Sequence, residues 1–204
     1  GRRRRWPARY AAGDVMAESK LQRYHKLLGQ LANERASWES HWREVAEHIL
    51  PRRIRLDNST RNRGEKVNAK ILNGTATKAL RTMRSGLQSG ITSPARPWFK
   101  MSTGDTELDE YNPVKVWLET VTDMIAAEFA RSNLYTQLPN VYSDLGAFGT
   151  AAFLLEESES NDPSVPLLRA YSFPIGSYYL GLDAQLRPAT FVRKFTMTVR
   201  QIME

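Results

Sequence analysis

The stretch LQRYHKLLGQLANERASWESHWREVAEHILP, Leu21 to Pro51, decides the first part of the fold. Steps of three and four residues place one series of side chains on one side of an α-helix. The series comprises Leu21, Tyr24, Leu28, Leu31, Arg35, Trp38, Trp42, Val45 and Ile49. Pro51 ends the helix, because proline disfavours helical backbone in the preceding residue and has no amide proton to donate. A pattern of about four heptads predicts a long helix that packs along a neighbour. Arg35 interrupts the series, and we expect its side chain to reach the edge of the packed face.

A basic loop and a second helix are predicted next. Residues 51–66, PRRIRLDNSTRNRGEK, are rich in turn-forming residues, and a helix fits Val67 to about Ser89. At about 100° per residue, this helix has an apolar face and an opposite basic stripe. The apolar face comprises Leu72, Ala76, Ala79, Leu80, Met83 and Leu87, and the stripe comprises Lys70, Lys78, Arg81 and Arg84. The loop adds Arg52, Arg53, Arg55, Arg61, Arg63 and Lys66.

The segment SGITSPARPWFKM, Ser89 to Met101, forms a stiff basic and aromatic corner. Pro94 and Pro97 fix their own backbone and restrict the residues before them, so Arg96 and Trp98 point in defined directions. Two interpretations stay open. Trp98 could fill the core as a buried aromatic ring. Alternatively, Arg96 and Trp98 could anchor an interface or bind nucleic acid, since arginine and tryptophan are favoured in both roles.

The remainder of the chain changes from helices to strands. Asn112-Pro113 predicts a helix start, with Asn112 as the cap, and Ser132-Asn133 separates this helix from another that reaches Gly149. We expect the apolar face of the first to comprise Val114, Trp117, Leu118, Val121, Ile125 and Phe129. The runs TAAFLLEE, VPLLRAYSF, SYYLGL and ATFVRKFTM predict short strands, and the spacing of Thr198 and Gln201 predicts the start of a further helix.

These elements predict an α+β fold, with long helices first and a short-stranded antiparallel region after them. We divide the chain into a disordered, Arg-rich leader (1–15), a mainly helical region (16–149) and a β-rich region (150–204) that ends as a further helix begins. Met16 fits a natural start. A helix that begins so near residue 204 leads us to expect a fragment of a longer protein, truncated at its C-terminus.

The net charge of +7 is divided unequally along the chain. Residues 16–100 carry a net +10, whereas residues 101–204 carry a net −7. Halves of opposite sign can attract polyanions or dock against each other within or between subunits. The chain has no cysteine, which excludes disulfides and thiolate metal sites. No apolar run reaches the roughly 18 residues of a membrane span, so we expect no membrane partner.

No sequence motif predicts catalysis, and we expect no catalytic residue, cofactor or metal and no enzymatic activity. Walker A and GxGxxG patterns are missing from the sequence. Gly146 to Gly149, GAFG, fits a closely packed helix end better than a phosphate loop. His41, Glu44 and His48 could share one helix side, but they fit solvent-facing residues better than metal ligands. The acidic group Asp105, Glu107, Asp109 and Glu110 leaves a metal-dependent nuclease open as a third hypothesis.

Several blocks of the sequence, in order, resemble the head-to-tail connecting (portal) proteins of short-tailed (podovirus-type) bacteriophages. They are WESHWREVAEHILPRRIR (38–55), NGTATKALRTMRSGLQSGITSPARPWFKM (73–101), VKVWLETV (114–121), RSNLYTQLPNVYSDLGAFGTAAFLLEE (131–157) and VRKFTMTVRQIME (192–204). The resemblance covers Met16 to Glu204 and implies the N-terminal part of such a protein, near its wing-like region. The stem and channel-lining segments would follow Glu204.

The resemblance implies a structural subunit of a homo-oligomeric ring, usually a dodecamer, at one capsid vertex. It also implies DNA packaging through the ring by a terminase motor, ejection through the same conduit, and contacts with capsid proteins, tail proteins and double-stranded DNA. The protein would lie in the virion and, during assembly, in the host cytoplasm. The family supplies no catalytic residues. The alternative from the residues themselves is a monomeric, sequence-independent DNA-binding module.

Heterologous ring contacts need two different complementary patches, which a basic half and an acidic half supply. The candidate residues for contacts with a neighbouring subunit or with nucleic acid are Arg52, Arg53, Arg55, Arg61, Arg63, Lys66, Lys70, Lys78, Arg81, Arg84, Arg96 and Trp98. We expect the basic residues to meet a neighbouring subunit in preference to DNA.

Overall fold

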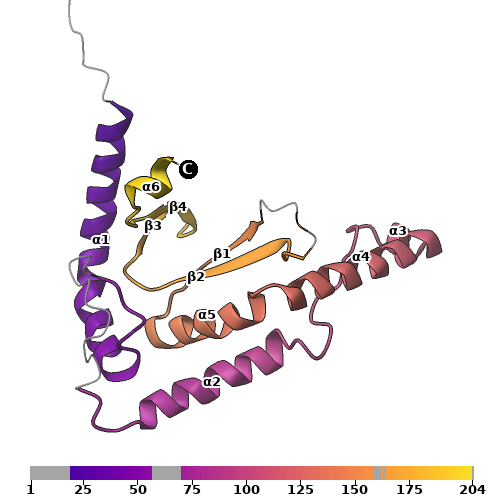
Figure 1. Ribbon diagram of the computed structural model, residues 1–204, viewed down its shortest axis with the longest axis horizontal. Coiled ribbons are helices and arrows are strands. Elements are labelled where there is room, and N and C mark those ends of the chain that lie inside the picture. The colour runs from indigo at the N-terminus through magenta and orange to yellow at the C-terminus, as the bar shows by residue number, and fades with distance from the viewer. Residues whose placement is uncertain (1–18, 57–69, 159–161, 163, 204) are drawn as a thin grey trace, which may run out of the picture.

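The computed structural model describes residues 19–56, 70–158, 162 and 164–203. The helices are α1 (Lys20–Ile49), α2 (Thr75–Ile91), α3 (Thr106–Glu110), α4 (Asn112–Arg131), α5 (Leu134–Phe148) and α6 (Val199–Met203). The strands are β1 (Ala152–Glu157), β2 (Leu168–Phe173), β3 (Tyr178–Leu182) and β4 (Pro188–Arg193). Two antiparallel hairpins, β1–β2 and β3–β4, form separate two-stranded sheets. The predicted α+β fold is confirmed, with helices first and strands after them (Figure 1). The expected leader, residues 1–15, lies outside the described part.

Helix α1 is the long helix that the sequence predicts. Ser19 and Gln22 cap its start reciprocally, and the helix ends at Ile49, two residues before Pro51. Its apolar series is only partly packed: Leu31 is buried and Trp42 and Val45 are half-buried, whereas Leu21, Tyr24 and Trp38 are mostly exposed. In Figure 1, α1 stands across the end of α5, and its first turns extend beyond the β3–β4 hairpin.

The expectation that Arg35 reaches the edge of this helix is wrong. Its side chain is only 9% exposed, and its guanidinium lies 3.8 Å from the ring centre of Tyr179. Nη1 donates to the carbonyl oxygens of Gly176 at 2.9 Å and Tyr178 at 2.8 Å, and Nε donates to Glu39 at 2.9 Å. A buried guanidinium needs acceptors for its donors, and the turn between β2 and β3 provides them. Arg35 therefore joins α1 to the strands.

Helix α2 begins later than predicted and lies against α5 (Figure 1). It starts at Thr75; residues 67–69 of the predicted helix are outside the described part, and Lys70 to Gly74 are not helical. Gly146 of α5 faces the ends of the Met83 and Leu80 side chains of α2. A Cβ there would collide with the Met83 side chain and lie 3.1 Å from Cδ1 of Leu80. Gly149 ends α5 with a φ of 73°, so the interpretation of GAFG as a closely packed helix end is confirmed.

The main core lies where the C-terminal ends of α1 and α5 meet the segment from β2 to β3. Its buried members are Ala46, Phe148, Phe173, Ile175 and Tyr178. The turn after α1 joins this core through a parallel bridge between Ile54 and Ile175. Gly176 has a φ of 87°, and a Cβ there would lie 2.6 Å from the carbonyl oxygen of Arg55, so glycine is required at this contact.

Helices α3 and α4 form an arm at the end of the molecule opposite α1 (Figure 1). Asn112 is the first helical residue of α4 rather than its cap; Tyr111 precedes it with extended backbone. The predicted break at Ser132 is confirmed, since α4 ends at Arg131 and α5 starts at Leu134. In the described part of the chain, no helix combines the length and the apolar character needed to cross a membrane.

A candidate interaction surface

The candidate basic residues do not form one continuous patch in the described part of the chain. Arg52, Arg53 and Arg55 lie in and beside the turn after α1, and Lys78, Arg81 and Arg84 lie on α2. Lys70 precedes α2 and is therefore not part of a helical stripe. Arg61, Arg63 and Lys66 lie outside the described residues. The remaining candidates fall into two groups: residues that bond to other parts of the same chain, and residues whose side chains are exposed.

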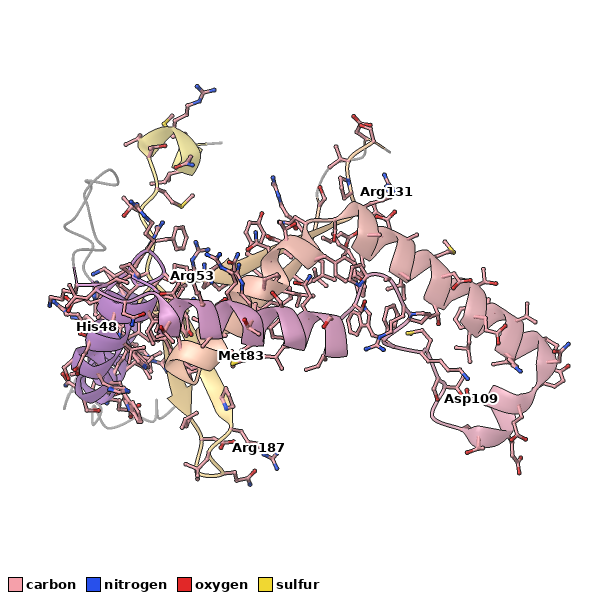
Figure 2. All side chains as sticks on the ribbon, turned by 90° about the horizontal axis from the view of Figure 1, so that it is seen from below. His48, Arg53, Met83, Asp109, Arg131 and Arg187 are labelled. Atoms are coloured by element: carbon pink, nitrogen blue, oxygen red, sulfur yellow. The ribbon has the colours of Figure 1, made fainter. Side chains whose placement is uncertain are left out.

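Arg53 is engaged inside the molecule. Its Nε donates to Oδ1 of Asp144 at 3.0 Å and its Nη2 donates to Oδ2 at 2.5 Å, so the guanidinium binds both carboxylate oxygens. Nη2 also donates to the Ser172 hydroxyl at 2.9 Å, and that hydroxyl donates to Gln137 at 3.1 Å. Asp144 is only 1% exposed. The network joins the turn after α1 to α5 and β2, and Figure 2 places Arg53 beside these elements.

The charges of this pair explain why neither partner can be replaced alone. Burial raises the pKa of the Asp144 carboxyl, while the hydrogen bonds and the charge of Arg53 lower it. An unpaired carboxylate would be costly at this depth. Asp144 was missed as a functional or structural residue from the sequence. Periodicity offers no signal for it, because α5 also carries Gln137, Asn140 and Ser143, and the burial of Asp144 is evident only in the structure.

The other basic residues near α1 are exposed. Arg55 uses its backbone amide to donate to the carbonyl of Ile175 at 2.8 Å, while its side chain is exposed. Lys70 forms an ion pair with Glu47, with Nζ 2.6 Å from Oε2, and Arg52 is exposed. Surface ion pairs such as Lys70–Glu47 contribute little to stability. These side chains therefore remain accessible to a partner.

The outer face of α2 carries accessible charge. Lys78 and Arg81 are exposed, and Arg84 is half-buried. No residue in the described ranges forms an ion pair with Lys78 or Arg81. Leu80 and Leu87 are half-buried on the inward side, as the sequence predicts. The same prediction is wrong for Ala76, Ala79 and Met83, which are exposed, and Leu72 lies before the helix and is exposed.

The corner between the two prolines has mainly internal contacts. Nη2 of Arg96 donates to the carbonyls of Ser89 at 3.0 Å and Gly90 at 3.1 Å, at the C-terminal end of α2, where a cation is favourable. Trp98 is half-buried; its ring stacks on Phe129 with centroids 6.0 Å apart, and its Nε1 donates to the Tyr135 hydroxyl at 3.1 Å. Of the two interpretations, the packing favours Trp98 as an internal aromatic.

The acidic segment before α4 is organised by its own hydrogen bonds. The Asp105 carboxylate caps α3 by accepting from the amide of Glu107. Asp109 accepts from the hydroxyls of Ser102 and Thr103 and from the amide of Thr103, and these bonds lower the pKa of its carboxyl to about 2. Among the described residues, no group of three or more histidine, aspartate or glutamate side chains could hold a metal ion. Figure 2 shows Asp109 at the end of the molecule remote from Arg53.

Helix α4 exposes apolar side chains that the sequence does not place there. The expectation that Trp117 packs inward is wrong, because it is 61% exposed. Val116 and Met124 are 54% and 65% exposed, while Leu118 is buried on the packed side. Trp117 and Leu118 are adjacent, and a single helix face cannot bury both when the packed contacts centre on Leu118 and Phe129. The arm thus joins an acidic segment to an apolar face that the described residues leave exposed.

Comparisons with known proteins relate this chain to phage proteins. The family model described as bacteriophage head to tail connecting protein matches residues 21–204. A portal protein of Salmonella phage epsilon15 is 45% identical over 189 residues, which cover 93% of this chain and 33% of the relative. A probable portal protein of Bordetella phage BPP-1 is 43% identical over 176 residues, which cover 86% of this chain and 31% of the relative. The chain spans about a third of the length of these relatives.

Proposed function

Because the chain belongs to the bacteriophage head to tail connecting protein family, we propose that it is part of a structural subunit of a phage portal. The observation that carries this proposal is the family match over residues 21–204, together with 45% identity to the portal protein of phage epsilon15. The subunit would form a homo-oligomeric ring at one capsid vertex of the virion. The same ring would serve as the conduit for DNA packaging and ejection and as the attachment site of the tail.

The surface of the chain supports a subunit that contacts identical neighbours. A ring built from heterologous contacts joins two different surfaces of the same chain. Exposed cations on α2 and exposed acidic and apolar side chains on the α3–α4 arm are two such surfaces. The terminase motor, capsid proteins, tail proteins and double-stranded DNA are the proposed partners of the complete assembly, and the subunit itself has no catalytic role.

Internal contacts weigh against the alternative of a monomeric DNA-binding module. Arg53 binds Asp144, and Arg96 binds the carbonyls at the end of α2. A phosphate contact by either guanidinium would compete with these bonds. The exposed candidates that remain can neutralise phosphates, and each phosphate contact would steepen the salt dependence of log affinity by about 0.9 for duplex DNA. We prefer contact with a neighbouring subunit for the basic surface, because the α3–α4 arm of an identical chain offers exposed acidic side chains to receive it.

Native mass spectrometry of the protein expressed from its whole reading frame tests the proposal. One closed oligomer of fixed subunit number, a dodecamer or a similar ring, is expected. A monomer at all concentrations would contradict the proposed role. Magnesium-dependent DNA cleavage that a single substitution in the Asp105–Glu110 segment abolishes would favour the nuclease hypothesis instead.

A further inference from the structure

Helix α4 is apolar on two sides, but the described chain covers only one of them. Leu118 is buried and Ile125 and Phe129 are half-buried on the packed side. The second side presents Val116, Trp117 and Met124, and the exposed positions between them are Pro113, Thr120 and Ala127. A helix that is apolar around most of its circumference is typical of a buried environment. The first side contacts Trp98 and Phe99 through Phe129, whereas no described residue buries the second side, which therefore requires another partner.

The exposed apolar side of α4 has acidic residues along one flank. Glu119 and Asp123 are both exposed and lie one turn apart, next to Val116 around the helix. No ion pair joins Glu119 or Asp123 to another described residue. A partner for this surface should therefore combine a flat or small-residue surface, able to receive Trp117 and Met124, with positive charge along one edge.

The outer face of α2 has these properties. Ala79, Thr82, Gly86 and Ser89 are exposed on the side away from α5, and nothing lies within 4 Å of the position a Cβ would take at Gly86. Small residues allow large side chains of another helix to approach closely. Lys78 and Arg81 lie along one flank of this face, about 4.5 Å apart along the helix axis. The α2 face therefore matches the α4 face in both shape and charge.

We propose that the exposed face of α4, centred on Trp117 and Met124, docks on the outer face of α2 in a second copy of this chain. This inference rests on the proposed ring-forming role and names the surfaces that would meet. In one chain, α2 packs on α5 with its small-residue face turned away, and α4 extends toward the opposite end from α1 (Figure 1). Two different faces that meet between copies make a heterologous contact, the kind that closes into a ring.

The positions of the charges also fix the direction of the helices. At about 100° per residue, Glu119 and Asp123 flank the exposed face of α4 on one side. When each face is viewed with the N-terminus of its helix at the top, Lys78 and Arg81 flank the α2 face on that same side. Such flanks meet when the two helices run antiparallel, whereas parallel helices would place them on opposite sides of the contact. Antiparallel docking aligns Asp123 with Lys78 and Glu119 with Arg81. Opposite charges at these positions favour one register over others.

A charge exchange tests this docking in the protein expressed from its whole reading frame. The variant Glu119→Lys/Asp123→Lys and the variant Lys78→Glu/Arg81→Glu should each reduce the assembled fraction at least tenfold in sedimentation velocity. Both pairs of changes in one chain should restore assembly. Glu34→Lys/Glu44→Lys, on exposed positions of α1, is the matched control and should assemble as the unchanged protein does. Assembly of both reversed variants at the unchanged level would overturn the docking.

Cysteine cross-linking gives a second readout. Residues 1–204 contain no cysteine, and any cysteine elsewhere in the reading frame is first replaced by serine. Thr120→Cys and Thr82→Cys in one chain should form intermolecular disulfides and a ladder on a non-reducing gel. The control variant Thr120→Cys/Ser40→Cys, with Ser40 at an exposed position of α1, should form no such ladder. Absence of the ladder, or equal cross-linking in both variants, would overturn the proposed contact.

The two proposals fail in different ways. Rings in the unchanged protein together with rings in both charge-reversed variants would leave the portal role intact and refute the α4–α2 contact. No closed oligomer in the unchanged protein would refute the portal role. The cross-link between cysteines at positions 82 and 120 tests the α4–α2 contact separately: its formation supports the contact, and its absence refutes it.

Discussion

The guanidinium of Arg53 binds both carboxylate oxygens of Asp144, and this ion pair joins the turn after α1 to the inward side of α5. The two residues are separated by 91 positions in the sequence, and Asp144 is nearly inaccessible to solvent. The pair therefore helps to hold the C-terminal end of α1 against α5. It also removes Arg53 from the set of cations available to a neighbouring subunit or to DNA.

Removing one partner of this pair should destabilise the monomer. Asp144→Ala leaves the Arg53 guanidinium with only the Ser172 hydroxyl as acceptor. Loss of one partner of a buried pair costs on the order of 3 to 5 kcal/mol, and we expect a smaller loss because the Arg53 side chain is 21% exposed. Thermal and urea denaturation followed by circular dichroism measures the change. Arg55→Ala, at an exposed neighbouring position, is the control and should alter stability little. An Asp144→Ala protein as stable as the control would show that the pair is not structurally important.

Trp98 and Trp117 should respond differently to truncation. Trp98 is half-buried against Phe129 and bonds to Tyr135, so Trp98→Ala should cost a few kcal/mol, at or below the roughly 3 to 5 kcal/mol of a fully buried aromatic. Trp117 is mostly exposed, so Trp117→Ala should leave the stability of the monomer nearly unchanged and weaken assembly. Denaturation of the monomer and sedimentation of the oligomer separate the two effects. Equal loss of monomer stability in both variants would contradict the assignment.

A side chain at position 146 should push aside the end of the Met83 side chain. Gly146→Val should destabilise the chain by an amount near the lower end of the about 1 to 3 kcal/mol typical of overpacking, because the flexible and partly exposed Met83 side chain can turn away. Met83→Ala should recover part of that loss, and a double-mutant cycle measures the coupling between the two positions. Additive effects would mean that the helices do not meet at these residues.

The low pKa of Asp109 predicts a local dependence on pH. Hydrogen bonds from Ser102 and Thr103 lower the pKa of its carboxyl group to about 2, below the ordinary value of 3.8. Since the folded pKa is depressed, the stabilisation is present above the ordinary value and is lost as the pH falls toward 2. Carboxyl chemical shifts measured by NMR should give a midpoint near 2, and Asp109→Asn should remove the titration and loosen the turn before α3. A midpoint near 3.8 would contradict these hydrogen bonds.

Local patterns predict most elements of the fold, because they depend on neighbouring residues. The heptad spacing and Pro51 predict α1, Ser132-Asn133 predicts the boundary between α4 and α5, and the apolar runs after Gly149 predict all four strands. The start of α2 at Thr75 could not be predicted in this way. Asn73 and Thr75 form side-chain contacts there that compete with a helix starting earlier.

Long-range contacts limit what the sequence predicts about the surface. Burial of Arg35 depends on carbonyls of Gly176 and Tyr178, and the role of Arg53 depends on Asp144. Neither partner is close in sequence, so composition and periodicity place both arginines on the surface. Trp117 shows the converse, since it continues an apolar pattern but is 61% exposed on a side of α4 that no described residue covers. Of these three residues, Arg35 and Arg53 therefore serve the monomer, and Trp117 is the one that bears on assembly.

Electron microscopy of the protein expressed from its whole reading frame tests the central claim most directly. Two-dimensional class averages should show closed rings with a central channel and one rotational symmetry, as expected for a head-to-tail connecting protein. The same preparation should hydrolyse neither ATP nor DNA. Monomers that bind duplex DNA and form no rings at any concentration would contradict the portal assignment and support the DNA-binding alternative.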